Sequence, residues 1–490
     1  MNKKIIYGVA GVFIALLSLS IGSCKKTQIS SPQLTAANMT DSIPAAGGTV
    51  ALSFTCNGAW TIDTTGFGWL QLSQVSGTDG AATINLTAGA NTTGISRSVL
   101  LYVSSTNGQA RRITVLQIPV IFPSYNTSPV APDATGMGST AIQINANIKL
   151  GYNIWNTMEA PGGETGWGNP VITQSLIDTL KNAGFNAIRI PCQYWWSHAN
   201  HTTMKIDTAW LSRVKQVVQY CINDGMYVVL NDHWDNGWLD CTASGAKLDT
   251  IKATQKAIWE QVATKMRDFD EHLMFASSNE PNANDMQSSV NLHDFHQIFI
   301  NAVRSTGGKN AYRTLVIQAP STSIDLANYF TPDGIPGMPY DAVPNKLILE
   351  VHYYSPPNFC IIDADVSWGK EWRYWGANFH STDDTLRNST AGTEEGYMDS
   401  TMVWVNKMFV SKNIPVLIGE FGVADHSKNC PNPKDSILSL TSTAHFYGEL
   451  VRSARANGVS PFLWAGVINR QNETIGSRQQ LDSMRKAAGY

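Results

Sequence analysis

The spacing of hydrophobic residues along the chain changes near residue 118. Between residues 31 and 118, short stretches such as 50–54 and 99–103 alternate hydrophobic and polar positions, and turn signals such as Asn107-Gly108 separate them. Alternation with a period of two is typical of strands that bury one face. Short strands at this spacing predict a small all-β, immunoglobulin-like sandwich over residues 31–118.

From residue 135 to residue 490, strand-like hydrophobic runs alternate with helical patterns. The helical patterns end at Gly184, Gly225 and Gly307, and glycine is the usual residue just past a helix C-terminus. Eight such strand-and-helix units predict an α/β domain over 135–490, a (β/α)8 TIM barrel with enlarged loops. The eight predicted strands lie at 149–154, 185–190, 226–231, 273–277, 314–318, 347–351, 416–419 and 459–464.

The segment at 119–134 separates the two patterns. It holds Pro119, Pro123, Pro129 and Pro132 and little hydrophobic periodicity. A proline-rich segment without such periodicity is typical of a stiff, extended connection. We therefore expect a linker that holds the second domain at a set distance from the first.

The N-terminal residues have the pattern of a targeting signal. Lys3 and Lys4 precede a hydrophobic stretch over 5–21, and the segment ends in Ile-Gly-Ser followed by Cys24. This ending resembles the lipobox of bacterial lipoproteins. The resemblance implies that residues 1–23 are removed and that Cys24 is acylated, whereas a plain signal peptide with a chance cysteine is the alternative. We expect an outer-membrane lipoprotein of a Gram-negative bacterium, surface-exposed or periplasmic, that meets the membrane through its lipid anchor only.

Composition narrows the classes of function. Hydrophobic residues make up 43% and charged residues 15% of the 490 residues, which is typical of a globular protein. The formal net charge of -3 leaves no basic field to bind nucleic acid. The 15 tryptophans and 16 tyrosines offer flat aromatic faces that can stack on sugar rings, although about half of them are expected in the core.

Polar and aromatic residues follow six of the predicted barrel strands. The C-terminal ends of the strands carry the reactive groups in barrels of this kind. Any one of these residues could have an ordinary structural role, but six coinciding strand ends favour a site. The candidates are Arg189, His233, Asn279, Glu280, His352, Tyr354, Glu420 and Trp464.

Two of the candidates are glutamates at the ends of the fourth and seventh strands. Retaining glycoside hydrolysis needs one protonated and one ionised carboxyl group about 5–5.5 Å apart. We expect Glu280 to be the acid/base, its proton favoured by the nearby negative charge of Glu420. We expect Glu420 to be the nucleophile, kept ionised by Arg189 and hydrogen-bonded by Tyr354.

The remaining candidates are expected to bind the sugar. Asn279 is placed to bond the 2-hydroxyl, and Trp464 to form the floor under the ring. His233 and His352 are expected to donate hydrogen bonds to sugar hydroxyls or to Glu420. A metal bound by His233 and His352 is the alternative, but no HExxH motif, Asp-rich loop or CxxC spacing supports one, so we expect neither metal nor cofactor. Two tryptophans on strand-to-helix loops, Trp196 and Trp238, are predicted to line the cleft.

Taken in order, the strand-end motifs resemble glycoside hydrolase family 5. They are Arg189-Ile190-Pro191, Asn279-Glu280-Pro281, His352-Tyr353-Tyr354, Ile418-Gly419-Glu420-Phe421-Gly422 and Trp464. The resemblance covers the whole predicted barrel and implies the eight site residues named above. The first domain resembles a BACON domain in Trp60-Thr61-Ile62, Trp69-Leu70, Ser76-Gly77, Asn91, Arg97 and Gln117. Such a domain could bind carbohydrate or act as a stalk.

The opening of the barrel further resembles subfamily 4 of that family, over 151–157 and 164–170. That group consists mostly of endo-β-1,4-glucanases, many of which act on xyloglucan, mixed-linkage glucan or cellulose derivatives. The chain departs from the pattern at Trp155, at Trp234 and at Ala465-Gly466, which bears on substrate preference. We therefore expect a monomeric endo-acting β-glucanase. The alternatives are a β-mannanase on the same scaffold and a non-catalytic surface glycan-binding protein.

Overall fold

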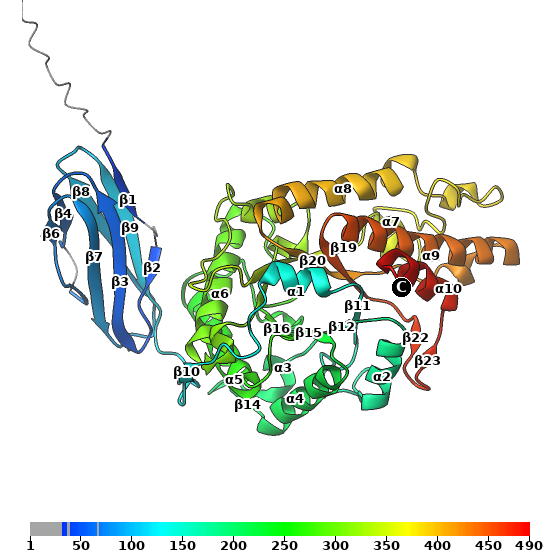
Figure 1. Cartoon of the computed structure of the whole chain (residues 1–490), viewed down its shortest axis with the longest axis horizontal. Helices are drawn as coiled ribbons and strands as arrows, with labels where there is room; N and C mark the ends of the chain where they lie inside the picture. Colours follow the sequence, from blue (N-terminus) through cyan, green and yellow to red (C-terminus); the bar gives the residue numbers. More distant parts are fainter. Residues whose placement is uncertain (1–31, 37–39, 66–67) are drawn as a thin grey trace, which may run out of the picture. The chain divides into compact units, whose positions relative to one another are not determined.

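The computed structural model describes residues 32–36, 40–65 and 68–490, so the predicted signal segment and Cys24 lie outside the described residues. The described chain divides into two compact units, a strand-rich N-terminal unit and a larger unit that contains the barrel (Figure 1). Among the helices of the described part, none has the length and hydrophobicity needed to cross a membrane.

The N-terminal unit is a sandwich of two sheets, as the alternating pattern predicts. Leu52, Phe54, Ile84 and Leu101 are buried between the sheets, and the Trp60 ring meets Phe54 edge-on at 5.0 Å. One sheet has the order β1 (Leu34–Ala36), β3 (Gly47–Cys56), β7 (Gly80–Gly89), β5 (Leu70–Leu72). The other has the order β2 (Thr40–Ser42), β9 (Ala110–Gln117), β8 (Arg97–Ser105), β4 (Trp60–Asp63), β6 (Ser76–Gly77).

Eight parallel strands of the described chain close into a barrel, and each coincides with a predicted strand. In order they are β11 (Gly151–Asn153), β12 (Ala187–Ile190), β15 (Tyr227–Asn231), β16 (Leu273–Ala276), β18 (Leu315–Gln318), β19 (Leu347–Tyr353), β20 (Val416–Phe421) and β21 (Val459–Leu463). The register shifts between β19 and β20, so that His352 pairs with Glu420. This shift sets two candidate site residues side by side.

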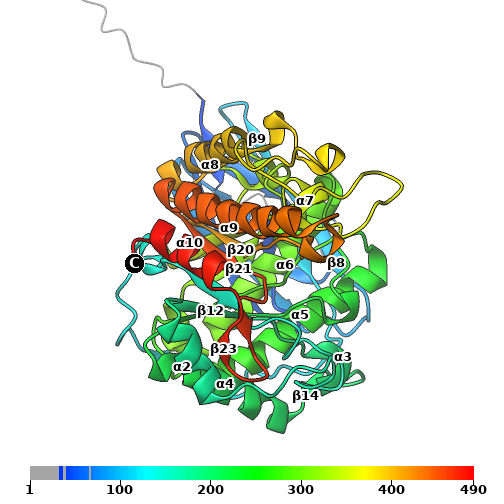
Figure 2. The same cartoon turned by 90° about the vertical axis from the view of Figure 1, so that its right-hand side faces the viewer.

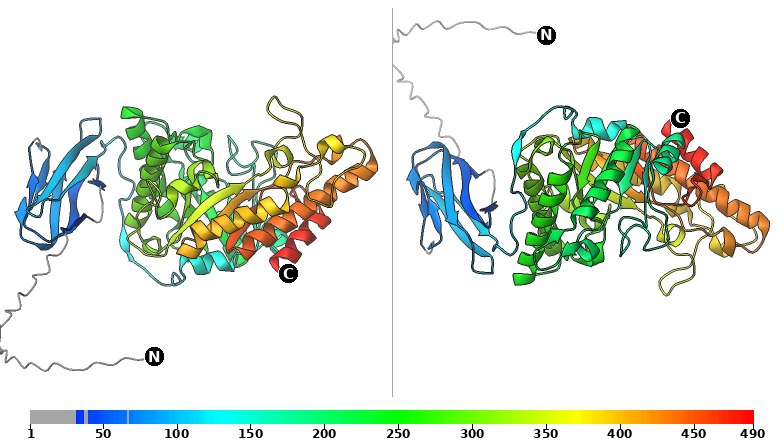
Figure 3. Two further views of the ribbon diagram at one scale, coloured as in Figure 1. Left: turned by 90° about the horizontal axis from the view of Figure 1, so that it is seen from above. Right: turned by 90° about the horizontal axis from the view of Figure 1, so that it is seen from below.

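Helices surround the barrel, which the turned views show from other sides (Figures 2 and 3). Gly184, Gly225 and Gly307 all have positive φ just past helix ends, as their positions predict. On the outside, α9 and α10 pack side by side. The main helices are α2 (Gln174–Asn182), α4 (Thr208–Asn223), α5 (Gly245–Met266), α6 (Met286–Ser305), α8 (Glu395–Met408), α9 (Pro433–Ala456) and α10 (Arg478–Ala488).

One end of the barrel is closed by the short helix α1 (Ala141–Asn147). Its Ile144 packs against the inner side chains of the strands, among them Val229 and Phe462. The Asn145 amide donates to two carbonyls, those of Val416 and Gly458, at the start of β20 and just before β21. Because the strand starts are plugged in this way, the open end is the one where the strands finish.

The second half of the predicted linker packs on the barrel unit. The Tyr125 amide donates to the Glu260 carboxylate at 2.7 Å, and β10 (Val130–Pro132) pairs with β17 (Gly307–Gly308). These contacts fix the chain over this stretch, whereas the predicted domain boundaries stay predictions. The cysteines of the described chain are free thiols, and Cys192 and Cys221 are buried in the core as predicted.

Candidate active site

A cavity of about 710 Å³ lies where the barrel strands end. Because parallel strands expose their carboxyl ends at one side of a barrel, side chains that are far apart in sequence converge there. Asn279, Glu280, Tyr354, Glu420, His233 and Trp464 are part of its wall. The structure therefore brings together six of the eight residues predicted at strand ends, and the other two, Arg189 and His352, lie directly behind the glutamates.

The two glutamates meet across the cavity from different strands. Glu280 follows β16 and leaves half of its side chain exposed, whereas Glu420 belongs to β20 and is 6% exposed. One carboxylate oxygen of each, together with a ring nitrogen of His352, fall within 4.8 Å of one another. This separation suits direct attack by one carboxylate while the other serves the leaving group.

Glu420 is held in place by two donors. The Arg189 Nη1 atom lies 2.9 Å from Glu420 Oε1, and the Tyr354 hydroxyl donates to Glu420 Oε2 at 3.0 Å. Burial, and then the negative charge of Glu420, raise the pKa of Tyr354 well above its ordinary value. The phenol therefore stays protonated and keeps donating to the carboxylate.

The Arg189 guanidinium, which is fully buried, orients more than the nucleophile candidate. Its Nη2 donates to Asn279 Oδ1 at 2.6 Å, which leaves the amide N–H groups of Asn279 as the donors available to a sugar. Its Nε lies 2.9 Å from Glu350 Oε1. The same arginine therefore places a carboxylate and an amide at fixed positions in the cavity wall.

Glu350 is a member of the site that the strand-end pattern misses. It lies inside β19 with no exposed surface and accepts a hydrogen bond from Gln318 Nε2 at 2.6 Å. A glutamate within the hydrophobic run Leu-Ile-Leu-Glu-Val could have revealed it, since glutamate is almost never fully buried unless it is paired.

His352 connects the acidic residues of the site. Its Nδ1 lies 2.7 Å from Glu280 Oε1 and 3.6 Å from Glu420 Oε2, and its Nε2 lies 3.4 Å from Glu350 Oε1. Burial alone would lower the pKa of His352, but the charge of Glu420 and its bonds to Glu280 and Glu350 raise that pKa to about 9. The imidazole is therefore a cation near neutral pH.

The proton of the acid/base candidate is not where the sequence predicts it. Burial raises the pKa of Glu280, but the hydrogen bond and positive charge of His352, followed by Arg189, lower that pKa below its ordinary value overall. The expectation that Glu420 keeps Glu280 protonated is therefore wrong. The proton rests on His352, and the two groups titrate as one pair.

The floor of the cavity is aromatic. The His233 ring stacks on Trp464 with centroids 5.5 Å apart and planes within 10°. Burial, and then the positive charges of Arg189 and His352, hold the pKa of His233 well below its ordinary value, so that this imidazole is neutral. The Trp155 ring, at a position that departs from the family pattern, lies tilted beside Trp464 with centroids 6.5 Å apart and packs against the floor.

The two tryptophans predicted on loops do not line the cavity. Trp238 is half-buried and donates its indole N–H to Asp232 Oδ2 at 3.1 Å, and Trp196 meets Trp234 edge-on at 5.5 Å. Trp234, which is 55% exposed, stands in the cavity wall instead. Neither Trp196 nor Trp238 is part of this cavity wall, and their contact with a substrate stays a prediction.

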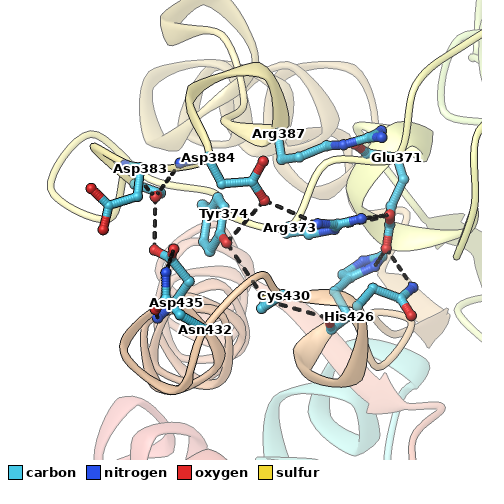
Figure 4. A network of polar contacts seen from close by, with 12 residues as sticks. Glu371, Arg373, Tyr374, Asp383, Asp384, Arg387, His426, Cys430, Asn432 and Asp435 are labelled. Atoms are coloured by element: carbon cyan, nitrogen blue, oxygen red, sulfur yellow. Dashed lines mark hydrogen bonds and ion pairs between the residues drawn. The ribbon is translucent and has the colours of Figure 1, made fainter.

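A polar network holds the long loop between β19 and α8 (Figure 4). The buried Glu371 accepts hydrogen bonds from Arg373 Nε at 3.0 Å and from Asn429 Nδ2 at 2.9 Å, and it lies 3.0 Å from His426 Nδ1. His426 and Asn429 come from the segment after β20. The network therefore ties two strand-to-helix segments together beside Ile361, which belongs to the cavity wall.

Comparisons with known proteins agree with this geometry. The family model described as "Cellulase (glycosyl hydrolase family 5)" matches residues 150–469, and the model described as "Viral BACON domain" matches residues 27–118. A xyloglucan-specific endo-β-1,4-glucanase of Bacteroides ovatus is 33% identical over 429 residues, which is 83% of this chain and 80% of that enzyme.

Solved structures give the same result. A Bacteroides ovatus family 5 xyloglucanase in complex with a XXXG heptasaccharide has a TM-score of 0.71 at 30% identity, covering 94% of this chain and all of that one. A xyloglucan-specific β-1,4-glucanase from a ruminal metagenomic library, in complex with XXLG, has a TM-score of 0.65 at 36% identity, covering 71% of this chain and 96% of that one. From its barrel, its carboxyl pair and these matches, the chain belongs to glycoside hydrolase family 5.

Proposed function

We propose that this enzyme cuts the backbone of a β-1,4-glucan by double displacement, with Glu420 as the nucleophile and Glu280 as the acid/base. Retention of the anomeric configuration is general for family 5 enzymes. The observation that carries the assignment is the pair of carboxyl groups at the ends of β16 and β20, one locked to Arg189 and Tyr354 and one half exposed to the cavity.

In the first step, a carboxylate oxygen of Glu420 attacks the anomeric carbon while the glycosidic bond breaks. The leaving oxygen takes its proton from Glu280, so that no free alkoxide forms. The resulting ester removes the negative charge of Glu420. In the second step Glu280 is a carboxylate that takes a proton from water, and the oxygen of that water displaces Glu420 from the sugar.

As substrate we propose a xyloglucan-type polysaccharide. Three relatives that align over 83%, 94% and 71% of this chain are named as xyloglucanases or xyloglucan-specific glucanases, whereas others of comparable coverage are named as endoglucanases or lichenases. The cavity wall offers the exposed Trp234 ring and Ile361, which suit bulky, branched chains better than a narrow polar slot does. Asn279 faces the same cavity, where its amide can bond an equatorial 2-hydroxyl of glucose.

We also propose that Cys24 carries a lipid that anchors the enzyme in the outer membrane of a Gram-negative cell, as a monomer. The motif that ends in Cys24 supports this, and the BACON-like domain then serves as a spacer above the membrane. Cys24→Ser should move the enzyme from the membrane fraction to the soluble fraction and abolish labelling by a fatty acid. Full membrane retention of that variant would contradict the anchor.

A hydrolysis screen tests the activity. We expect long products early in the digestion of xyloglucan, with slower action on mixed-linkage glucan and carboxymethylcellulose. The product released first should keep the β configuration when followed by NMR. Release of only monosaccharide or disaccharide from the start would contradict endo action, and a preference for mannan would replace the proposed substrate.

A further inference from the structure

One buried carboxylate behind the site has no role in the steps above. Glu350 is fully buried and is not part of the cavity wall, so it cannot touch a substrate there. Its contacts are Arg189 Nε at 2.9 Å, Gln318 Nε2 at 2.6 Å and His352 Nε2 at 3.4 Å. An ionised carboxylate is costly to bury, so a position that keeps one needs a reason.

We propose that Glu350 is a positioning residue that stores the catalytic proton on His352, next to Glu280, and aims Arg189 at Glu420. The inference rests on the function proposed above. It adds a group that neither touches the sugar nor exchanges a proton with it.

The two nitrogens of His352 explain how this works. Glu350 accepts from the Nε2–H, which fixes the ring and leaves Nδ1 facing Glu280 Oε1 at 2.7 Å. When the glycosidic oxygen approaches, the Nδ1–H bond breaks, an O–H bond forms at Glu280, and that proton passes to the leaving oxygen. The imidazole ends neutral with its Nε2–H still bonded to Glu350, so charge and protons balance over the step.

The charges that face His352 determine how its protonated form responds to the loss of the Glu350 charge. Three carboxylates surround it, Glu280 after β16, Glu350 on the same strand and Glu420 on β20. The positive charge that opposes it is Arg189 on β12, whereas His233 is neutral and Tyr354 is a protonated phenol. Removing the charge of Glu350 therefore makes the imidazolium less stable.

Packing shows that the position of Glu350 is built into the barrel. Gly419 lies on the neighbouring strand, next to Glu420, and a Cβ added there would come within 1.8 Å of Glu350 Oε1. The strand therefore leaves room for this carboxylate at the residue beside the nucleophile. A larger side chain at 419 would displace Glu350 from both Arg189 and His352.

The test compares Glu350→Gln with Glu371→Gln in the full chain. Both changes remove a buried carboxylate that is bound to an arginine and a histidine, but Glu371 lies outside the site. The substrates are a xyloglucan oligosaccharide, which needs a protonated leaving group, and a dinitrophenyl β-cellobioside, which does not. The measured quantity is kcat/KM as a function of pH, for each variant with each substrate.

In Glu350→Gln we expect kcat/KM to fall about tenfold more on the oligosaccharide than on the dinitrophenyl glycoside. The basic limb of the pH profile should move to lower pH, because the pair of His352 and Glu280 loses its proton more easily. Glu371→Gln should change neither the ratio of kcat/KM between the two substrates nor the position of the basic limb. Equal losses on both substrates, with an unmoved basic limb, would overturn the inference.

Failure of the inference is separable from failure of the proposed function. Glu280→Gln must lose the oligosaccharide activity and keep much of the dinitrophenyl activity, and if it does not, the acid/base assignment itself is wrong. If Glu350→Gln does not fold, NMR titration of the histidines in the unaltered enzyme tests instead whether His352 holds the proton. His352 should titrate at about 9, and a neutral His352 at pH 7 would overturn the inference.

Discussion

Two buried glutamates in this enzyme, Glu350 and Glu371, are each paired with one arginine and one histidine, but the two histidines face different groups. Glu350 is bound to Arg189 and His352, and Glu371 to Arg373 and His426. What differs is the second nitrogen of each imidazole. The His426 Nε2 lies 2.7 Å from the Phe359 carbonyl, whereas the His352 Nδ1 lies 2.7 Å from Glu280, a side chain half exposed to the cavity.

This difference separates a structural network from a reactive one. In the loop network around Glu371, one imidazole nitrogen of His426 faces Glu371 and the other faces the Phe359 carbonyl, so neither nitrogen faces a substrate. In the barrel network the second nitrogen ends on a carboxyl group that a sugar can reach. The same three residue types therefore hold a loop in one place and supply a proton in the other.

The largest expected effect falls at the open end of the barrel network. Glu280→Gln and Glu420→Gln should each lower kcat/KM on xyloglucan by about 10⁴-fold or more, since each removes a group that takes part in bond breaking. Both variants should keep the fold, because glutamine has the same shape. Circular dichroism and binding of a xyloglucan oligosaccharide serve as controls, and full activity in either variant would end the assignment.

The next effect concerns the loop network around Glu371 and appears in the free energy of unfolding rather than in activity. Glu371→Gln removes one of the two carboxylates that bind Arg373, the other being Asp384 at 3.0 Å, and should lower the free energy of unfolding by about 1.5–3 kcal/mol. Denaturant unfolding measures the loss. The exposed pair of Arg452 and Asp399 is the control, where Asp399→Asn should cost about 1 kcal/mol or less.

The pH dependence of that loss has a definite sign. Burial raises the pKa of Glu371, but its bonds to Arg373, Asn429 and His426 lower that pKa overall. A carboxylate with a lowered pKa stabilises the fold above its unfolded pKa of about 4.3, and the stabilisation is lost as the pH falls further towards the folded pKa. The difference between the two proteins should therefore shrink on acidification. A difference that grew instead would contradict an ionised Glu371.

The barrel and the positions of the strand-end residues could be predicted from the sequence, for a physical reason. A strand buried on both sides reads as a short hydrophobic run, and a polar residue right after it must point into the mouth. Glu280 follows β16, and Arg189 and Glu420 are the next-to-last residues of β12 and β20. Glu350 lies deeper, in the middle of β19, and the sequence does not show which barrel neighbours it meets.

The sequence also does not show which tryptophan of the loop after β15 faces the cavity. Asp235, Asn236 and Gly237 have φ values of 40°, 62° and 67°. Three successive left-handed residues turn the chain sharply between Trp234 and Trp238, so that one ring faces the cavity and the other meets Asp232. The resting position of the proton was also beyond the sequence, since it depends on three carboxylates that only the folded barrel brings around His352.

The barrel network around Glu350 and His352 should also affect the pH profile of the unaltered enzyme. The raised pKa of His352, to about 9, means that its proton is present at neutral pH and lost as the pH rises through that value. Activity should therefore persist to mildly alkaline pH and then fall about tenfold per pH unit, because one essential proton is lost. His426→Asn, in the loop network, should leave this limb in place. A basic limb near the ordinary pKa of glutamate, about 4.3, would show that His352 does not hold the proton.

The smallest effect is expected at the cavity wall, away from both networks. Trp234→Ala removes an exposed ring that can stack on a sugar, and such a contact is worth about 0.5–1.5 kcal/mol. KM for xyloglucan should rise by about two- to tenfold while kcat changes little, because the ring binds ground state and transition state alike. Trp238→Phe is the matched control, since that ring lies behind the wall on Asp232. If the control raised KM as much as Trp234→Ala did, the substrate would contact the loop in another way, and the exposed ring would not be its binding surface.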